Sequence, residues 1–301
     1  MMKTKLVMMA ALGVVLMSCE KPLMAEDENG EAIEEGAKAP SKLFRFTVKG
    51  DFGNPVFTEG ATRGYLSADN QEMTDLWVFD FVGDDCVQMV HQESNDDDWG
   101  EPSMQLTHGT HHVCFVASRG DDPTVDDDAN TITWSGPRDT FWKDYEVTVV
   151  STSNGNRAVT LDRVATRLRI NITDEIPDGV ASLVIKPTTW YYGLNYRTGS
   201  PVGAMTNHER IISVPASYIG SVGVLSASIF GLSSTTEWTT DVSLKVKDGN
   251  GIVMAEAEID AAPLKANRTT EYSGELFTSD SNESMDVSLN STWATAYTGT
   301  W

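Results

Sequence analysis

The sequence predicts an all-β protein with two β-sandwich domains in tandem, and three observations carry this prediction. Hydrophobic residues recur at every second position in many short segments, which is the period of a half-buried strand. Clusters of Gly, Asn, Asp and Pro separate these segments at the spacing of sandwich turns. No long amphipathic helix interrupts them, although one short helix is expected at residues 138–144. The 283 residues left when the first 18 are removed are enough for two cores.

Residues 1–18 are predicted to be a targeting segment rather than part of the fold. Lys3 and Lys5 precede an apolar run at residues 6–17, which has the length of a signal peptide and is too short to span a bilayer. The run ends at Cys19 in the order Leu-Met-Ser-Cys, which resembles a bacterial lipobox. We therefore expect residues 1–18 to be a lipoprotein signal peptide and Cys19 to be the lipidated residue. An ordinary secretory signal is the alternative.

Residues 19–40 are predicted to be an acidic, flexible tether, because they are rich in Glu and contain no aromatic residue. The whole chain has 44 acidic and 22 basic residues, and its formal net charge is −22. This charge argues against nucleic acid as a partner, since nucleic-acid binding depends on Lys and Arg side chains that contact phosphates. It is typical of an exposed surface in water.

The first expected strand lies within residues 41–63. Phe44, Phe46 and Val48 alternate with polar residues, so they share one face of this strand. Burying them stabilises the fold by roughly 4–9 kcal/mol as an upper bound, against roughly 5–15 kcal/mol for a whole domain. The strand is therefore either permanent or replaced by an equivalent one. The loop that follows ends in small residues around Arg63 and Gly64, which favour access of a protease to the bond between them. An ordinary first strand with an ordinary loop is the alternative.

The remaining strands divide into two groups at a turn signal, Asn154-Gly155-Asn156. We expect a first domain at residues 41–155 and a second at residues 156–301. The main strands expected after the first one lie at residues 76–82, 111–118, 145–150, 164–172, 182–186, 211–214, 224–230, 242–246, 252–259, 271–277 and 285–293. The last of these segments places Met285, Val287, Leu289 and Trp293 on one face.

Few residues suggest chemistry. Cys86 and Cys114 could form a disulfide in an exported protein, although small apolar thiols on strands are commoner. His108, His111 and His112 do not make a metal site, because adjacent strand residues point to opposite faces and zinc needs three or four ligands. No catalytic or cofactor-binding motif is present. The aromatic segment at residues 190–192 could stack on sugars, but packing in a core is the stronger interpretation.

Several segments, taken in order along nearly the whole chain, resemble the fimbrillin family of Bacteroidales, which comprises the subunits and anchor proteins of type V pili. The likeness begins with the lipobox, the acidic tether and the amphipathic strand before Thr62-Arg63-Gly64. It continues at residues 73–80, 115–118, 161–168 and 267–270, with Gly274 and Leu276. No single motif is specific, and the resemblance rests on the order of the whole.

The resemblance implies two transthyretin-like β-sandwich domains, no enzymatic activity, no cofactor, and export as an outer-membrane lipoprotein at the cell surface. For shaft subunits it implies that an Arg-specific protease cuts between Arg63 and Gly64, and that a strand from another fimbrial subunit fills the groove left by Phe44, Phe46 and Val48. Anchor subunits instead keep the lipid and the first strand. A lipoprotein that binds surface glycans or a host is a further alternative, and a hydrolase is another, although the sequence shows no set of converging ionisable groups for it. The candidate donor strand within this chain carries Met285, Val287, Leu289 and Trp293, and the alternative is that it stays a fixed strand of its own domain.

Overall fold

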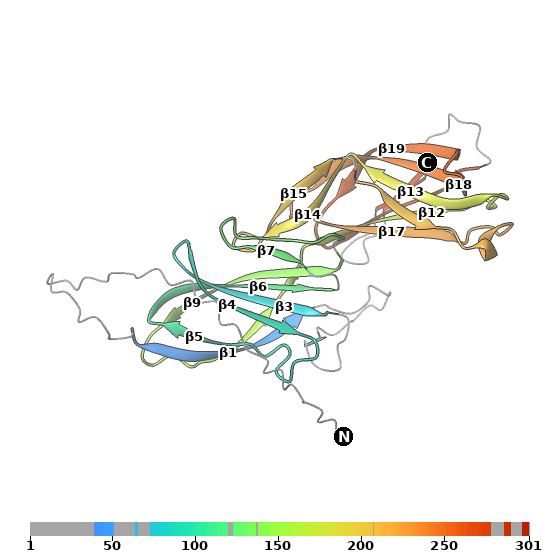
Figure 1. Cartoon of the computed structure of the whole chain (residues 1–301). Helices are drawn as coiled ribbons and strands as arrows, with labels where there is room; N and C mark the ends of the chain where they lie inside the picture. Colours follow the sequence, from blue (N-terminus) through green and yellow to red (C-terminus); the bar gives the residue numbers. More distant parts are fainter. Residues whose placement is uncertain are drawn as a thin grey trace, which may run out of the picture. The chain divides into compact units, whose positions relative to one another are not determined.

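The computed structural model describes residues 39–50, 64–65, 73–119, 123–136, 138–206, 208–277, 286–289 and 297–300. Within these ranges the chain forms strands and turns, together with one short 3-10 helix at Ala216–Tyr218 (Figure 1). No helix in these ranges is long and apolar enough to cross a membrane. The prediction of an all-β fold is confirmed.

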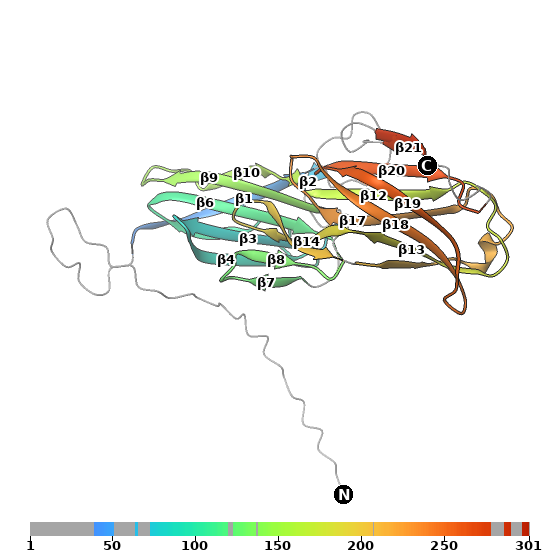
Figure 2. The same ribbon diagram turned by 90° about the horizontal axis from the view of Figure 1, so that it is seen from above.

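The first sandwich consists of two sheets that face each other across a hydrophobic core. The first sheet contains β1 (Ser41–Gly50), β2 (Gly64–Tyr65), β5 (Ser103–Thr107) and β10 (Asn156–Thr160). The second sheet has the order β11-β9-β6-β3-β4, with β3 (Asp75–Val82), β4 (Asp85–Glu93), β6 (Gly109–Ser118), β9 (Thr140–Val149) and β11 (Asp162–Arg163). Figure 2 shows β9, β6, β3 and β4 side by side.

The second sandwich is also built from two sheets. One has the order β17-β12-β20-β22-β21, with β12 (Ala165–Ile172), β17 (Leu225–Leu232), β20 (Arg268–Gly274), β21 (Asp286–Leu289) and β22 (Tyr297–Thr300). The other has the order β16-β13-β18-β19, with β13 (Val180–Pro187), β16 (Arg210–Ser213), β18 (Trp238–Asp248) and β19 (Val253–Leu264).

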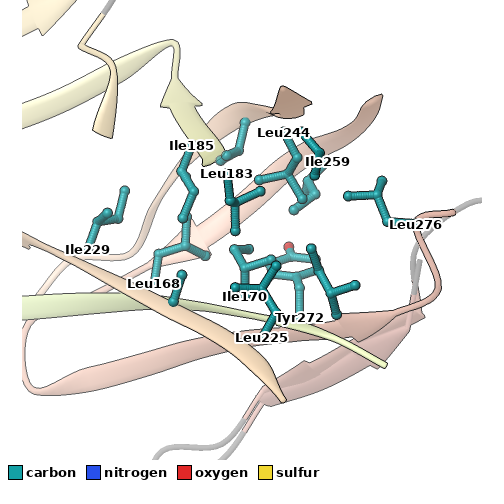
Figure 3. Close-up of a cluster of buried hydrophobic side chains, with 14 of the residues drawn as sticks. Leu168, Ile170, Leu183, Ile185, Leu225, Ile229, Leu244, Ile259, Tyr272 and Leu276 are labelled. Carbon is teal, nitrogen blue, oxygen red and sulfur yellow. The ribbon is translucent and has the colours of Figure 1, made fainter. Parts of the chain in front are cut away.

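The core of the second sandwich follows directly from the alternation of its strands. Figure 3 shows Leu183 and Ile185 of β13 and Leu244 of β18 pointing toward Leu168 and Ile170 of β12. All five side chains are fully buried. Residues between them in the sequence therefore point away from this core, so the outer face of the β13–β18 pair carries Val184 together with the polar Ser243 and Lys245.

A fifth sheet joins strands from both halves of the chain, in the order β15-β14-β8-β7. Its strands are β7 (Thr124–Asp126), β8 (Thr131–Thr133), β14 (Thr189–Asn195) and β15 (Ser200–Thr206). Beside it, Tyr196 stacks on Phe79 of the first sandwich with the ring centroids 3.7 Å apart. Trp142 donates a hydrogen bond from Nε1 to the carbonyl oxygen of Tyr196. The two halves of the chain therefore share one β-sheet in addition to the covalent link between them.

The strand pairing corrects one expectation and qualifies another. The short helix expected at residues 138–144 is wrong, because β9 begins at Thr140 and Phe141 points into the first core while Trp142 packs on the opposite side. The expected domain boundary after residue 155 stays a prediction. Pairing nevertheless continues in the first sandwich through β10 and β11, and passes to the second with β12 at Ala165.

Two segments quoted for the family resemblance lie together in the second sandwich, although about a hundred residues separate them. β12 and β20 pair in parallel, with Thr166 opposite Arg268 and Arg167 opposite Thr269. Arg167 donates a hydrogen bond from Nε to the Thr269 hydroxyl at 3.0 Å. The two segments are thus neighbouring strands of one sheet.

Candidate strand-exchange site

Strand β1 is the common partner of every other described strand in its sheet. Its first half, Ser41–Arg45, pairs antiparallel with β5, and Arg45–Lys49 pairs parallel with β10. Its last two residues pair with β2. No other pairing joins β2, β5 and β10 to one another among the described residues. Removing β1 therefore leaves three strands without a partner in this sheet.

The backbone of β1 is hydrogen-bonded along both of its edges. On one side the amides of Phe46 and Val48 donate to the carbonyl oxygens of Pro102 and Gly100, at 2.9 and 3.0 Å. On the other side the Arg45 amide donates to the Gly155 carbonyl at 2.7 Å. β1 thus occupies a slot with donors and acceptors on both walls, and any strand that replaced it would have to satisfy both.

The side chains of β1 fill the first core as the sequence predicts. Phe44, Phe46 and Val48 all have an exposed fraction of 0%. The ring of Phe46 meets Phe115 of β6 edge-to-face, with the centroids 5.2 Å apart. The guanidinium of Arg157 on β10 lies over the ring of Phe44, 5.1 Å from its centroid. These contacts give an alternating apolar template that a replacement strand must match.

Gly155 allows the wall on the β10 side to approach β1. A Cβ atom at this position would lie 2.1 Å from the carbonyl oxygen of Leu43 and 3.6 Å from the Cα of Phe44. Contact at 2.1 Å is impossible without moving the backbone, so only glycine fits here while β1 is in place. The sequence pattern identified Asn154-Gly155-Asn156 as a turn but did not reveal this contact with β1.

Of the two residues that flank the predicted cleavage site, the structure describes only Gly64, which lies next to the end of β1. Gly64 of β2 pairs directly with Gly50, the last residue of β1. Arg63 lies outside the described residues, and so does the predicted lipidation site Cys19. The predictions for both residues therefore stay predictions.

The structure also describes only part of the candidate donor segment. Val287 and Leu289 belong to β21, an edge strand that pairs only with β22 among the described strands. Met285 and Trp293 lie outside the described residues. In this structure β21 thus belongs to a sheet of the second sandwich, and its role as a donor remains a prediction.

A buried histidine, which the sequence pattern did not single out for this role, holds the end of β5 beside β1. His111 Nδ1 lies 2.8 Å from Asp80 Oδ1, and both side chains are 1% exposed. Its Nε2 lies 3.0 Å from the carbonyl oxygen of Thr107, which is paired with Ser41 of β1. Burial disfavours the charged ring, but the hydrogen bond and charge of Asp80 and the carbonyl of Thr107 outweigh it and raise the pKa of His111.

The other candidate residues take structural positions. His112 bonds to Asp144 at 3.0 Å, away from His111, and no group of three potential metal ligands occurs among the described residues. The thiols of Cys86 and Cys114 each donate to a backbone carbonyl. They lie on β4 and β6, which flank β3 in the sheet, so the backbones of these two strands are about 10 Å apart. A disulfide needs Cα atoms within about 7 Å, so these two cysteines do not pair in this fold.

The aromatic segment at residues 190–192 is mostly buried. Trp190 is 1% exposed and donates from Nε1 to the carbonyl oxygen of Phe230 at 2.8 Å, and Tyr192 is 4% exposed. Both belong to the second core. These rings therefore pack within the protein and offer no open platform for a sugar, as the core interpretation predicts.

No family model matches the sequence, and no curated protein matches it. Solved structures do match. A putative adhesin from Bacteroides ovatus is 13% identical over 78% of this chain and 90% of that chain, with a TM-score of 0.50. The fimbrial anchor protein Mfa2 from Porphyromonas gingivalis is 9% identical over 78% of this chain and 91% of that chain, with a TM-score of 0.47.

The tip fimbrial protein Mfa3 from Porphyromonas gingivalis, with a C-terminal truncation, is 12% identical over 77% of this chain and 94% of that chain, with a TM-score of 0.39. The first of these three neighbours is thus a putative adhesin, and the other two are fimbrial proteins. At such low identity the likeness to the Bacteroides ovatus protein shows a shared fold. It confirms the predicted all-β sandwich fold.

Proposed function

We propose that this protein is a structural subunit of a cell-surface fimbria, exported as a lipoprotein through Cys19 and assembled by protease-triggered strand exchange. The observation that supports it most is the position of β1 as the common partner in its sheet. A subunit that loses such a strand has exposed apolar side chains and unpaired backbone on both walls, which is a strong site for strand addition.

Cleavage between Arg63 and Gly64 separates β1 from the rest of the chain at a suitable place. Gly64 begins β2, which pairs with the last two residues of β1. After the cut, β2, β5 and β10 stay attached to the body of the subunit, while β1 is held only by burial and pairing. An Arg-specific protease is therefore the partner we expect for this step.

The strand that enters the groove comes from another fimbrial subunit, and the segment with Met285, Val287, Leu289 and Trp293 is our candidate. It has apolar residues at alternate positions, as Phe44, Phe46 and Val48 have. Its described part, β21, lies at the edge of a sheet, so fewer contacts must be broken to release it than for an interior strand.

A second candidate function is an uncleaved, lipid-anchored anchor subunit. The observation that favours it is that β1 is fully integrated in the uncut chain, with its three apolar side chains buried and both edges hydrogen-bonded. In that role the outer membrane is the partner through the lipid on Cys19, and β1 is permanent.

One experiment separates the two roles. We expect mass spectrometry of the protein from cells to find an N-terminus at Gly64 in fibres and a lipidated Cys19 in the precursor. Arg63→Ala should prevent both cleavage and assembly, and Arg63→Lys is the matched control because an Arg-specific protease discriminates against Lys. If Arg63→Ala assembles as well as the parent, exchange triggered by cleavage is wrong. Label from a fatty acid retained by Cys19→Ser would contradict lipidation at Cys19.

The donor is tested by crosslinking in a background without Cys86 and Cys114. One new cysteine replaces Val78, which faces the first core, and the other replaces Leu289. Intermolecular crosslinks that require cleavage at Arg63 support donation by the C-terminal segment. Crosslinks that form equally in Arg63→Ala argue against it.

A further inference from the structure

The outer face of the second sandwich has a hollow that strand exchange does not use. It has a volume of about 270 Å³ and lies over β13 and β18, on the side opposite the core seen in Figure 3. A second hollow of about 240 Å³ adjoins it and shares Lys186, Ser243 and Lys245 with it. The two form one continuous trough across the pair of strands.

Strand alternation gathers lysines in this trough. Ser243, Lys245 and Lys247 alternate along β18 with the buried Val242, Leu244 and Val246, so they share the outer face. Lys186 lies on the neighbouring β13, directly opposite Ser243. The larger hollow is thus lined by three lysines and a single glutamate, Glu209. The smaller hollow adds Glu258, so the lysines outnumber the lining glutamates by one, in a chain whose formal net charge is −22.

The lysines are held in place but are not all neutralised. Lys186 lies 3.5 Å from Glu209, and Lys245 lies 3.2 Å from Glu256 on β19. Lys247 has no ion pair among the described residues, although it lines the same hollow. The neighbouring carboxylates therefore orient two of the amino groups at the rim, and the amino group of Lys247 is the one left to contact an anion.

The floor of the trough offers a hydrogen-bond donor. Ser243 lines both hollows, and its buried hydroxyl has no hydrogen-bond partner among the described residues. A buried hydroxyl without a partner is unfavourable, so such a group marks a place where an acceptor is expected. Beside it the floor is apolar, because Val184 is only 3% exposed although it lies on the outer face.

We propose that this trough binds a small anionic ligand that bears a carboxylate or phosphate group on a body about the size of one sugar ring. The anionic group contacts the lysine amino groups and accepts a hydrogen bond from Ser243, while the body rests on Val184 and the lysine methylenes. Binding is weak and falls with added salt, because the lysines are partly exposed. The site would give the fimbrial surface a preference for acidic sugars.

Saturation-transfer NMR with the full chain tests this proposal, since it detects weak ligands directly. The probes are sodium glucuronate for a carboxylate, glucose 6-phosphate for a phosphate, and glucose as the neutral control. We expect signals for one or both anionic probes and none for glucose, and the stronger anionic probe identifies the group that the site prefers. Equal signals for glucose and glucuronate would overturn the proposal, as would the absence of signals for both anionic probes.

Variants place the binding in the trough. Lys247→Gln disturbs no ion pair seen here, and we expect it to weaken the apparent affinity about two- to fivefold. Lys186→Gln combined with Lys245→Gln should weaken it further, and Ser243→Val removes the hydroxyl at nearly constant volume. Lys143→Gln is the matched control, because Lys143 pairs with Asp162 in the first sandwich. Loss of binding in the control, or full binding in all three trough variants, would place the ligand elsewhere.

Discussion

The strands that open the two sandwiches, β1 and β12, are held in different ways. All eight residues of β12 lie opposite residues of β17, and seven of them also lie opposite β20. β1 instead meets three shorter partners, each along only part of its length. Both strands are interior strands with buried apolar faces, so burial alone does not distinguish them.

Side-chain bonds make the difference clearer. From β12, Asn171 donates to Glu271 at 2.8 Å and accepts from Ser226 at 2.6 Å, so it links both neighbouring strands. Just before β12, Arg163 makes two hydrogen bonds to the Asp139 carboxylate, at 2.6 and 2.9 Å. β1 donates one such bond from Lys42 Nζ to the Ser153 carbonyl at 3.0 Å, and otherwise depends mainly on backbone pairing and apolar contact, which another alternating strand can reproduce. The comparison teaches that two interior strands with equally buried faces can be held differently, β1 mainly by pairing and apolar contact and β12 also by bonds specific to its side chains.

The largest expected effect is that of removing β1. A chain that begins at Gly64 should lose amide protection in β5 and β10, because among the described strands of their sheet both pair only with β1. Amides of β12 and β20 should exchange as slowly as in the intact chain. Hydrogen exchange read by mass spectrometry measures the two regions in one sample.

Adding the missing strand back sharpens this test. A peptide with the sequence of residues 41–50 should restore protection in β5 and β10, and the same peptide with Phe46→Asp should not, because it would bury a charge in the first core. Slow exchange of β5 and β10 without any peptide would show that β1 does not hold its sheet together. The comparison between β1 and β12 would then be wrong.

A smaller effect is expected at two glycines, one in each sandwich. Gly155→Ala places a Cβ 2.1 Å from the Leu43 carbonyl oxygen, and Gly231→Ala places one 2.6 Å from Cε2 of the buried Trp190. Each should lower the free energy of unfolding by about 1–3 kcal/mol, the usual cost of overpacking. Gly155→Ala should speed exchange in β1 and β10 only, whereas Gly231→Ala should affect the second core.

The control for both substitutions is Gly249→Ala, because no atom lies within 4 Å of a Cβ at Gly249. Urea unfolding followed by hydrogen exchange measures the size and the location of each change. Faster exchange throughout the chain in Gly155→Ala would mean that β1 is as tightly coupled to the whole fold as β12 is.

The sequence predicted the local features of these strands well. Alternation in residues 41–50 indicated which side chains of β1 are buried, since a period of two assigns each residue to a face. The same pattern located β3 and β6 to within two residues, with bounds at Asp75–Val82 and Gly109–Ser118. Local patterns report the face of a strand because the pleat fixes it.

What the sequence could not predict is which strands become neighbours. β10 follows the turn signal, and the pattern gave no reason to pair it in parallel with a strand more than a hundred residues earlier. The sheet that joins β7 and β8 to β14 and β15 was equally unpredictable, because its pairing depends on contacts between distant parts of the chain. The slot for β1, its contact with Gly155 and the lysine trough all follow from such pairings.

The smallest expected effect concerns two histidines whose pKa values move in opposite directions. In the first sandwich the pKa of His111 is raised, since Asp80 and the Thr107 carbonyl outweigh the cost of burial. In the second sandwich burial and the nearby Arg210 lower the pKa of His208. An NMR pH titration of the five imidazole rings, assigned by single substitutions, measures both values without unfolding the protein.

The consequences for stability have opposite signs. His111 contributes its full stabilisation below the unfolded-state pKa of about 6.5, and this contribution is lost as the pH rises through its raised folded-state value. Above its unfolded-state pKa of about 6.5, His208 does not reduce the free energy of unfolding. As the pH falls from there toward the lowered folded-state pKa of His208, the free energy of unfolding decreases. Raising the pH should therefore loosen the end of β5 beside β1 while it favours the second sandwich. Equal pKa values for the two rings, or a shift of both in one direction, would remove this difference between the sandwiches.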